Sequence, residues 1–217
     1  MRYIFVDFEM NPIAKKYREE RKHCGKEIIE IGAVMLDEDL KETSSFRKYV
    51  KPEYNSTVDN RYEDLTGIGI EMLAGADNFE KAFCEFMAWC GSDGYQIYAW
   101  SNSDKLQVER EMCLKGFEET EEVRYMFCNW IDFQKEFGEM ISAERAVSLE
   151  DALNICGIAF SGKKHDALYD ARNTSLLYAE AKTNNVAANI KEIKGRIGSE
   201  PMMTAIGDLF NFSELKF

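Results

Sequence analysis

Two acidic residues stand out because they occupy positions where a hydrophobic core is expected. Asp7 and Glu9 end an apolar run that begins after Arg2. Side chains alternate across a strand, so both carboxylates share one face, with their Cα atoms about 7 Å apart at roughly 3.3 Å per residue. Buried carboxylates this close repel each other and lose hydration, and a divalent cation is the usual compensation. The simpler interpretation is that Glu9 marks the point where the strand emerges into water.

A third acidic residue, Asp170, lies in the middle of an apolar helical stripe. An unpaired carboxylate on the core-facing side of a helix is costly, so Asp170 should meet an arginine or a metal ion. A structural salt bridge is therefore the alternative to a metal site. The stripe follows spacings of three and four residues and consists of Ala167, Asp170, Ala171, Thr174, Leu177, Tyr178 and Ala181.

Two further residues are ambiguous when each is considered alone. Asp104 stands near the start of a predicted helix, where a capping or first-turn acid is common. His165 precedes Asp170 by five residues and could belong to a surface loop with Lys163 and Lys164. Considered together, the four acids and the histidine fall at the ends of neighbouring elements, which favours one shared site.

The elements that must carry these residues alternate along the chain. Apolar runs predict strands, and apolar residues at spacings of three and four predict helices. The short 37–42 connection suits an antiparallel hairpin, and the overall order indicates an α/β fold with a mixed sheet. The predicted strands are 2–9, 27–36, 45–50 and 95–100, and the predicted helices are one ending near residue 90, then 103–115, 130–141, 149–156 and 167–183.

The composition limits the class of protein. The chain has 217 residues, of which 45% are hydrophobic and 30% charged, and this fits one compact domain, placed here at residues 1–183. The longest stretch without a charged residue, 152–162, is too short to cross a bilayer, and we expect no membrane association. The six cysteines form no CxxC pair, so we expect buried thiols in a reducing, cytoplasmic compartment. Residues 184–217 are expected to pack on the domain, on a second copy or on a protein partner.

Four segments carry motifs of one family: Asp7-Phe-Glu9, the strand 27–34 (Glu-Ile-Ile-Glu-Ile-Gly-Ala-Val), Leu65-Thr-Gly-Ile68, and the 165–174 segment His-Asp-Ala-Leu-Tyr-Asp-Ala-Arg-Asn-Thr. They resemble the DEDDh 3′→5′ exonucleases, a superfamily with an RNase H-like fold that includes RNase T, oligoribonuclease and the DNA polymerase proofreading subunit. The most similar branch contains the histone-mRNA exoribonuclease and a sporulation-pathway inhibitor. One motif departs from the pattern, because Ser101 replaces the glycine that usually precedes the aspartate corresponding to Asp104.

The resemblance implies an RNase H-like fold with a central mixed five-stranded sheet flanked by helices. It also implies two Mg²⁺ or Mn²⁺ ions held by Asp7, Glu9, Asp104 and Asp170, with Asp7 bridging the ions and Glu9 taking part in catalysis. His165 would contact the substrate and act as the general base that deprotonates the attacking water. The product would be a nucleoside 5′-monophosphate released from a single-stranded 3′ end.

The resemblance also places the terminal nucleotide beside Leu65 and Ile68, with Met10 as a further support. For Leu65 and Ile68, ordinary anchoring of a loop is the alternative. RNA is the expected substrate because of the branch resemblance, and a proofreading-type DNA exonuclease is the alternative among enzymes. A regulatory protein that uses the fold to bind a partner is the alternative from another class; the complete set of acids argues against it, because a binding module has no need of buried acids.

The charge of the chain is strongly uneven. A net charge of −12 argues against broad coating of nucleic acid, because the phosphate backbone is repelled. Residues 15–26, in contrast, hold six Lys or Arg against two Glu. This segment follows shortly after Glu9, so it could guide a single strand toward the acids, with Tyr17 available for base stacking. The alternative is a solvated, mobile loop whose charge aids only solubility.

Overall fold

A mixed sheet of five strands forms the centre of the computed structural model, which describes residues 1–183. β1 pairs with β2 and β2 with β3 in antiparallel fashion, whereas β1–β4 and β4–β5 are parallel. The predicted α/β fold with a mixed five-stranded sheet is confirmed. In the spatial order β3-β2-β1-β4-β5, the strands are β3 (Glu42–Tyr49), β2 (Lys26–Leu36), β1 (Arg2–Pro12), β4 (Tyr95–Ala99) and β5 (Trp130–Asp132).

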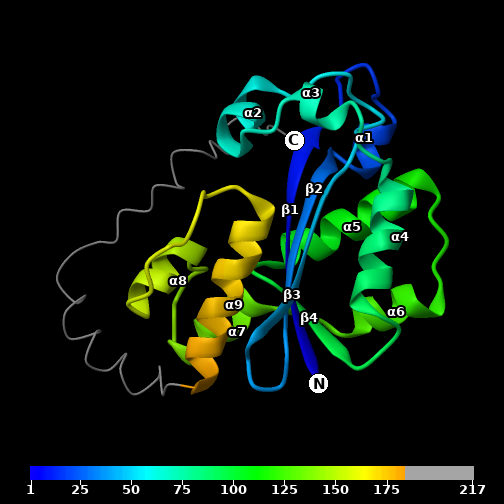
Figure 1. The fold of residues 1–217 in the computed structure, drawn as a ribbon. Helices are drawn as coiled ribbons and strands as arrows, with labels where there is room; N and C mark the ends of the chain where they lie inside the picture. Colours follow the sequence, from blue (N-terminus) through cyan, green and yellow to red (C-terminus); the bar gives the residue numbers. More distant parts are fainter. Residues whose placement is uncertain (184–217) are drawn as a thin grey trace.

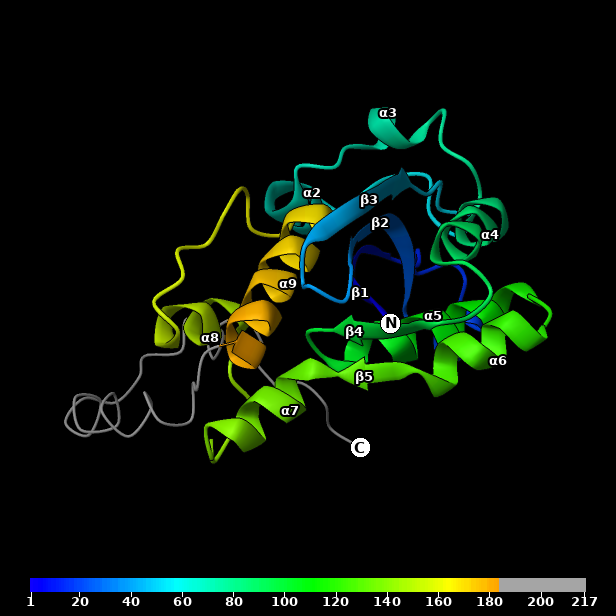
Figure 2. The same cartoon turned by 60° about the horizontal axis from the view of Figure 1, so that its bottom comes forward.

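Helices cover both faces of the sheet (Figures 1 and 2). α4, α5 and α6 lie on one face, α7, α8 and α9 lie on the other, and α1 to α3 lie beyond one end of the strands. The helices are α1 (Glu20–His23), α2 (Asn60–Thr66), α3 (Ile70–Leu73), α4 (Phe79–Cys90), α5 (Asn102–Lys115), α6 (Glu121–Cys128), α7 (Phe133–Met140), α8 (Leu149–Ile155) and α9 (Ala167–Thr183).

Alternate residues of β1 enter two separate hydrophobic cores. Val6 and Phe8 belong to the core beneath α4 and α5. Phe5 belongs to the core beneath α7 and α9, where its ring lies 5.1 Å from that of Tyr178. Because β1 is buried on both faces, an acidic residue near its end is held by a rigid central element.

One predicted helix is wrong at its start. The segment predicted as a helix from Trp130 to Ile141 begins with the strand β5, and the helix α7 starts only at Phe133. Trp130, Phe133 and Phe137 follow helical spacing, which hides the strand in the sequence. Asp132 ends the strand and caps the helix, because its side chain accepts a hydrogen bond from the Lys135 amide at 3.0 Å. The short helices α1, α2, α3 and α6 were not predicted.

The cysteines only partly match their prediction. All six are free thiols, but only Cys24 and Cys90 are buried, whereas Cys84, Cys113 and Cys128 are exposed. No helix within residues 1–183 combines the length and the apolar character needed to span a membrane. The predicted appendage 184–217 lies outside the described residues.

Candidate metal centre

Strand β1 brings Asp7 and Glu9 to the face of the sheet that α9 covers. Phe5, two residues before Asp7, is already buried against Tyr178 on that face. Asp7 is half-buried and Glu9 is only 8% exposed. The strand does not end at Glu9, since it continues to Pro12 and stays paired with β2. The interpretation of Glu9 as the exposed end of the strand is therefore wrong.

Helix α9 and the loop before it bring Asp170 and His165 to Glu9. Asp170 lies in the first turn of α9 and accepts a hydrogen bond from the His165 backbone amide at 3.0 Å. His165 has a φ of 58°, a left-handed conformation that this hydrogen bond helps to hold. Ligand atoms of Glu9, His165 and Asp170 all lie within 4.8 Å of one another. Residues from the first strand and the last described helix thus meet in one cluster.

Gly32 on β2 allows α9 to approach the sheet closely. A Cβ atom at this position would lie 2.1 Å from backbone atoms of Ala167 and Leu168, a distance that no side chain can adopt. The first turn of α9 can therefore lie directly on the strand only because residue 32 is glycine. This contact sets the depth at which Asp170 projects.

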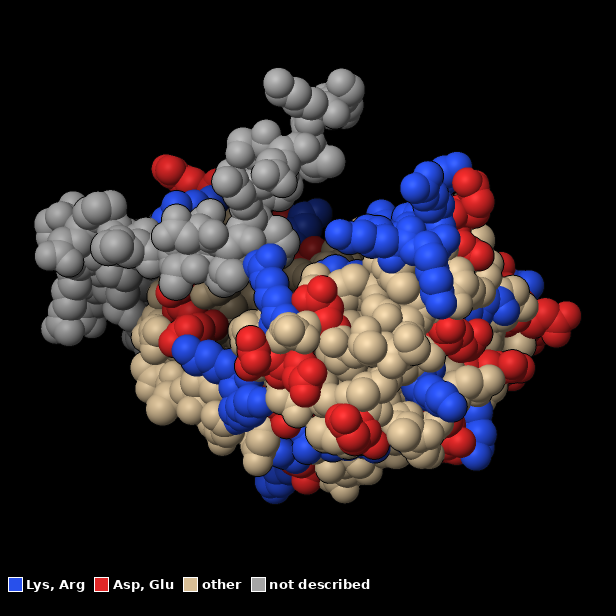
Figure 3. Space-filling model, turned by 90° about the horizontal axis from the view of Figure 1, so that it is seen from above, with Lys and Arg blue, Asp and Glu red and all other residues tan. Residues whose placement is uncertain are grey.

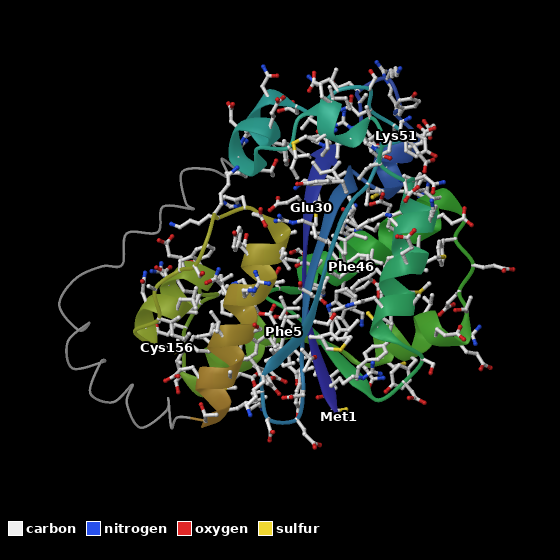
Figure 4. All side chains as sticks on the ribbon, in the orientation of Figure 1. Met1, Phe5, Glu30, Phe46, Lys51 and Cys156 are labelled. Atoms are coloured by element: carbon white, nitrogen blue, oxygen red, sulfur yellow. The ribbon has the colours of Figure 1, made fainter. Side chains whose placement is uncertain are left out.

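Glu30 and Arg47 hold the start of α9 against the sheet. The Glu30 side chain accepts a hydrogen bond from the Ala167 amide at 3.3 Å, and Figure 4 shows Glu30 between α9 and the strands. Arg47 of β3 pairs with Glu30 at 2.9 Å and also with Asp166. Sequence reasoning missed both residues, because they lie on different strands and only the sheet pairing brings them together.

Asn173 anchors the loop that carries His165. Its buried side chain accepts a hydrogen bond from the Ser161 amide at 2.9 Å and donates to the carbonyls of Ser161 and Tyr169 at 2.9 and 2.7 Å. All its hydrogen-bonding groups are therefore used locally. This residue was also missed, although it stands inside the 165–174 motif, since a single polar residue on a helix does not indicate its partner.

Helix α5 supplies Asp104 from the opposite face of the sheet. Asp104 lies in the first turn of the helix, as expected for an ordinary first-turn acid. Its side chain is nevertheless only 5% exposed, and its charge raises the pKa of Asp7. The helix is capped by Ser101, whose hydroxyl accepts a hydrogen bond from the Ser103 amide at 3.3 Å. Serine in place of the family's glycine thus still allows a well-formed helix start beside Asp104.

The four carboxyl groups hold protons more tightly than usual. Burial raises the pKa of Glu9 to about 8, with the charges of Asp170 and Glu30 adding to the effect. Burial also raises the pKa values of Asp104 and Asp170 to about 7 each. For Asp7, burial and the neighbouring Asp104 raise the pKa well above its ordinary value. In the absence of a cation, burial and mutual repulsion thus disfavour the charged forms of these groups up to about neutral pH.

The two lysines that precede His165 act on its titration. Partial burial lowers the pKa of His165, and the charges of Lys164 and Lys163 lower it further. Lys163 donates to the Thr66 carbonyl at 2.8 Å, and Lys164 pairs with Glu150 at 2.6 Å. A lowered pKa keeps the imidazole neutral, and therefore able to accept a proton, near neutral pH.

The three residues expected beside a nucleotide differ in exposure. Leu65 is 40% exposed at the end of α2, and Met10 is half-buried. Ile68 is only 2% exposed, so its side chain anchors the segment, as the alternative interpretation expects, and its contact with a base stays a prediction. Ile68 packs in a small core with Ile29, Val58 and Leu73.

The donor set suits a hard divalent cation. Such ions prefer carboxylate oxygens, and Glu9 and Asp170 offer theirs beside His165, while Asp7 and Asp104 lie near enough to affect the charges of this cluster. The nearest basic side chains pair elsewhere, since Arg47 binds Glu30 and Asp166 while Lys164 binds Glu150. Within residues 1–183, Asp170 is therefore not part of a structural salt bridge. Carboxylates that repel one another in the absence of a cation are well suited to bind a divalent cation.

Comparison with known proteins identifies the family. The exonuclease family RNase T matches residues 4–178, which is most of the chain. The chain belongs to this exonuclease family. The 3′-5′ exonuclease crn-4 of Caenorhabditis elegans is 35% identical over 182 residues, covering 77% of this chain and 60% of crn-4. The ERI1 exoribonuclease 2 of Homo sapiens is 26% identical over 193 residues, covering 80% of this chain but 27% of that protein.

Solved structures of the family share the fold. The nuclease domain of 3′hExo, a DEDDh family member bound to rAMP, has a TM-score of 0.74 at 22% identity and covers 86% of this chain and 94% of that domain. Cell-death related nuclease 4 has a TM-score of 0.69 at 22% identity, covering 83% of this chain and 63% of that one. The expected RNase H-like exonuclease fold is thereby confirmed. This chain spans about a quarter of the length of ERI1 exoribonuclease 2 and three fifths of the length of crn-4.

Proposed function

We propose that the protein is a divalent-metal-dependent 3′→5′ exoribonuclease. It removes nucleoside 5′-monophosphates from single-stranded 3′ ends. The observation that carries this proposal is the convergence of Glu9, His165 and Asp170, whose ligand atoms lie within 4.8 Å of one another in a family of exonucleases.

In this proposal, Asp7, Glu9, Asp104 and Asp170 hold two Mg²⁺ or Mn²⁺ ions. Asp7 would share in holding the ions with the other three acids, because the charges of Asp104, Asp170 and Glu9 all act on it. Bound cations would neutralise the carboxylates and polarise the scissile phosphodiester. The raised pKa values of Glu9, Asp104 and Asp170 support this assignment, because burial and the neighbouring carboxylates disfavour their charged forms, which a bound cation would stabilise.

His165 is the general base of the proposed reaction. Its lowered pKa leaves a neutral imidazole that accepts the proton of the attacking water. The hydrogen bond from its backbone to Asp170 places the ring beside the carboxylates. Lys163 links the His165 loop to Thr66, so it also joins the base to the segment where Leu65 lies exposed. Leu65 and Met10 are the proposed contacts of the terminal nucleotide.

RNA is the proposed substrate because several relatives bear the name exoribonuclease. The deciding assay uses single-stranded RNA, matched DNA and a duplex, each labelled at the 3′-terminal nucleotide, together with circular RNA as a control without a 3′ end. We expect labelled 5′-monophosphate from single-stranded RNA with Mn²⁺, none with EDTA, and an intact circle. Faster release from DNA would favour the proofreading-type alternative. Absence of any hydrolysis by a folded, metal-bound protein would favour a binding role.

A further inference from the structure

We infer that residues 15–26, termed the basic segment, form a docked surface that binds the phosphates of a single-stranded nucleic acid upstream of the metal centre. The inference rests on the proposed function and concerns capture of the strand, not the chemical step. It answers how a chain with a net charge of −12 holds a polyanion. A local surface can do so because charges are screened over about 8 Å at physiological ionic strength.

The basic segment is anchored at both ends. The Ile13 amide donates to the Gly25 carbonyl at 3.1 Å, and the side chains of Ile13 and Cys24 are buried. In its middle, Tyr17 packs edge-on against Tyr54 with ring centroids 5.3 Å apart. These contacts argue against a mobile loop whose charge serves only solubility.

The surface beneath the basic segment is also fixed. Tyr54 donates its amide to the buried Glu27 carboxylate at 2.8 Å, and its carbonyl accepts a hydrogen bond from the Ala14 amide at 2.9 Å. Asn55 donates to the Pro12 carbonyl at 2.8 Å. The positive charges therefore project from a platform that is tied to the central strand.

Most charges of the basic segment are free to bind an anion. Lys15, Lys16, Arg18 and Arg21 are exposed and form no ion pair with any described residue, whereas Lys22 pairs with Glu19 at 2.7 Å. Lys16 also lies over the Tyr17 ring at 4.9 Å. Figure 3 shows Lys and Arg side chains gathered on the end of the molecule where α1 lies. Clustered cations beside an aromatic ring are the pattern that single-stranded nucleic acids bind.

The position of the basic segment indicates which part of the strand it meets. β1 continues three residues past Glu9, so its end at Pro12 lies about 10 Å from Glu9 at 3.3 Å per residue. The basic segment lies past this end of the strand and not among the acids. It lies within reach of phosphates farther from the 3′ end, and its effect should appear only on longer substrates.

The test reverses Lys15, Lys16, Arg18 and Arg21 to Glu in the full chain. The matched control reverses four exposed cations away from this surface, Lys41, Arg124, Lys135 and Lys182, and gives the same net charge. With RNA of about 20 nucleotides, we expect KM to rise about tenfold or more for the first variant and much less for the control. Turnover of a dinucleotide should be nearly unchanged in both.

Binding can be measured separately from cleavage. In an Asp170→Asn background, the plot of log K against log salt should lose up to about 3 in slope when four phosphate contacts disappear, at about 0.7 per contact. The inference would be overturned if KM rose equally in the two four-residue variants or equally on long and short substrates. An unchanged salt slope of binding would also overturn it. A wild-type protein that binds RNA with this slope but cleaves nothing would instead refute the proposed function and leave the surface intact.

Discussion

Two clusters of buried acids in this molecule are compensated in opposite ways. At the far end of α5, Glu27 and Glu111 are fully buried, and Lys115 lies 3.1 and 2.9 Å from their carboxylates. The other carboxylate oxygens accept hydrogen bonds, for example from the Ile28 amide and from Gln107. At the candidate metal centre, four carboxyl groups act on one another's charge, and none of them pairs with a lysine or arginine among the described residues.

Under the proposed function, the difference reflects the separate roles of the two clusters. Where acids serve the structure, the chain provides a cation and amides that satisfy every oxygen, as buried charges require. The acids of the metal centre are partly satisfied by backbone amides, such as that of His165 for Asp170, but none of them forms an ion pair with a described lysine or arginine. This leaves the missing positive charge to come from outside the chain. Four predictions test this contrast, from the largest expected effect to the smallest.

Neutralising an acid should have opposite consequences in the two clusters. Asp7→Ala or Asp170→Asn should lower exonuclease activity by about 10³-fold or more, because several kcal/mol of metal-based stabilisation are lost. The same change should leave the metal-free protein as stable as the wild type, since it removes repulsion. Glu111→Gln should keep most of the activity per folded molecule but lower the melting temperature. If Asp170→Asn made the metal-free protein less stable, the acids of the metal centre would be stabilising the fold, as those of the other cluster do.

The histidine should be separable from the carboxylates of the metal centre. His165→Ala should lower turnover by roughly 10²–10⁴ while the stabilisation of the fold by Mn²⁺ remains. In the wild type, the rate should rise with pH and level off below the ordinary histidine pKa of about 6.5, because that pKa is lowered here. Single-turnover rates across pH measure the first effect, and melting curves with and without Mn²⁺ measure the stabilisation by the metal. A variant with wild-type turnover would return His165 to the role of a surface residue.

Removing the lysine of the structural cluster should destabilise the fold strongly. Lys115→Met should cost about 3–5 kcal/mol, because Glu27 and Glu111 would be left buried without a cation. Lys135→Met, at an exposed position, serves as the control and should change stability by less than about 0.5 kcal/mol. Urea unfolding gives both values. Equal stability of the two variants would mean that hydrogen bonds alone satisfy these acids.

The smallest effect concerns pH. The folded-state pKa values of Glu9, Asp104 and Asp170 are about 8, 7 and 7, above the values of roughly 4 in an unfolded chain. The metal-free fold thus binds these protons more tightly, and the stability they contribute is lost as pH rises through about 7 to 8. Unfolding in EDTA should show lower stability at high pH than at mildly acid pH, and Mg²⁺ should reduce the difference. If Mg²⁺ leaves the pH dependence of the stability unchanged, the groups that titrate in this range are not these carboxyl groups.

The sequence predicted the parts of the fold that depend on local patterns. The apolar run of β1 and the stripe of α9 were recognisable because burial repeats at fixed spacings. The strand β5 was not, since Trp130 and Phe133 follow helical spacing although the backbone changes type between them. The preference of a short segment was overridden here by its pairing with β4.

The site was predictable to the same extent. Asp7, Glu9 and Asp170 were noticed because charge interrupts an apolar pattern, and their proximity followed from the family resemblance. The groups that hold α9 in place had no such signal. Arg47 lies on a half-exposed strand, where arginine is ordinary, and its contacts with Glu30 and Asp166 span residues from distant parts of the chain.

The distance along the chain between Glu9 and Asp170 has a consequence for synthesis. The cluster that joins them cannot exist until the last described helix has left the ribosome and packed on the strand at Gly32. A nascent chain therefore carries Asp7 and Glu9 through the synthesis of the 161 residues up to Asp170 without the groups that complete the centre. Under the proposed function, the messenger RNA that encodes the protein, and the ribosome translating it, would be spared hydrolysis by an unfinished chain.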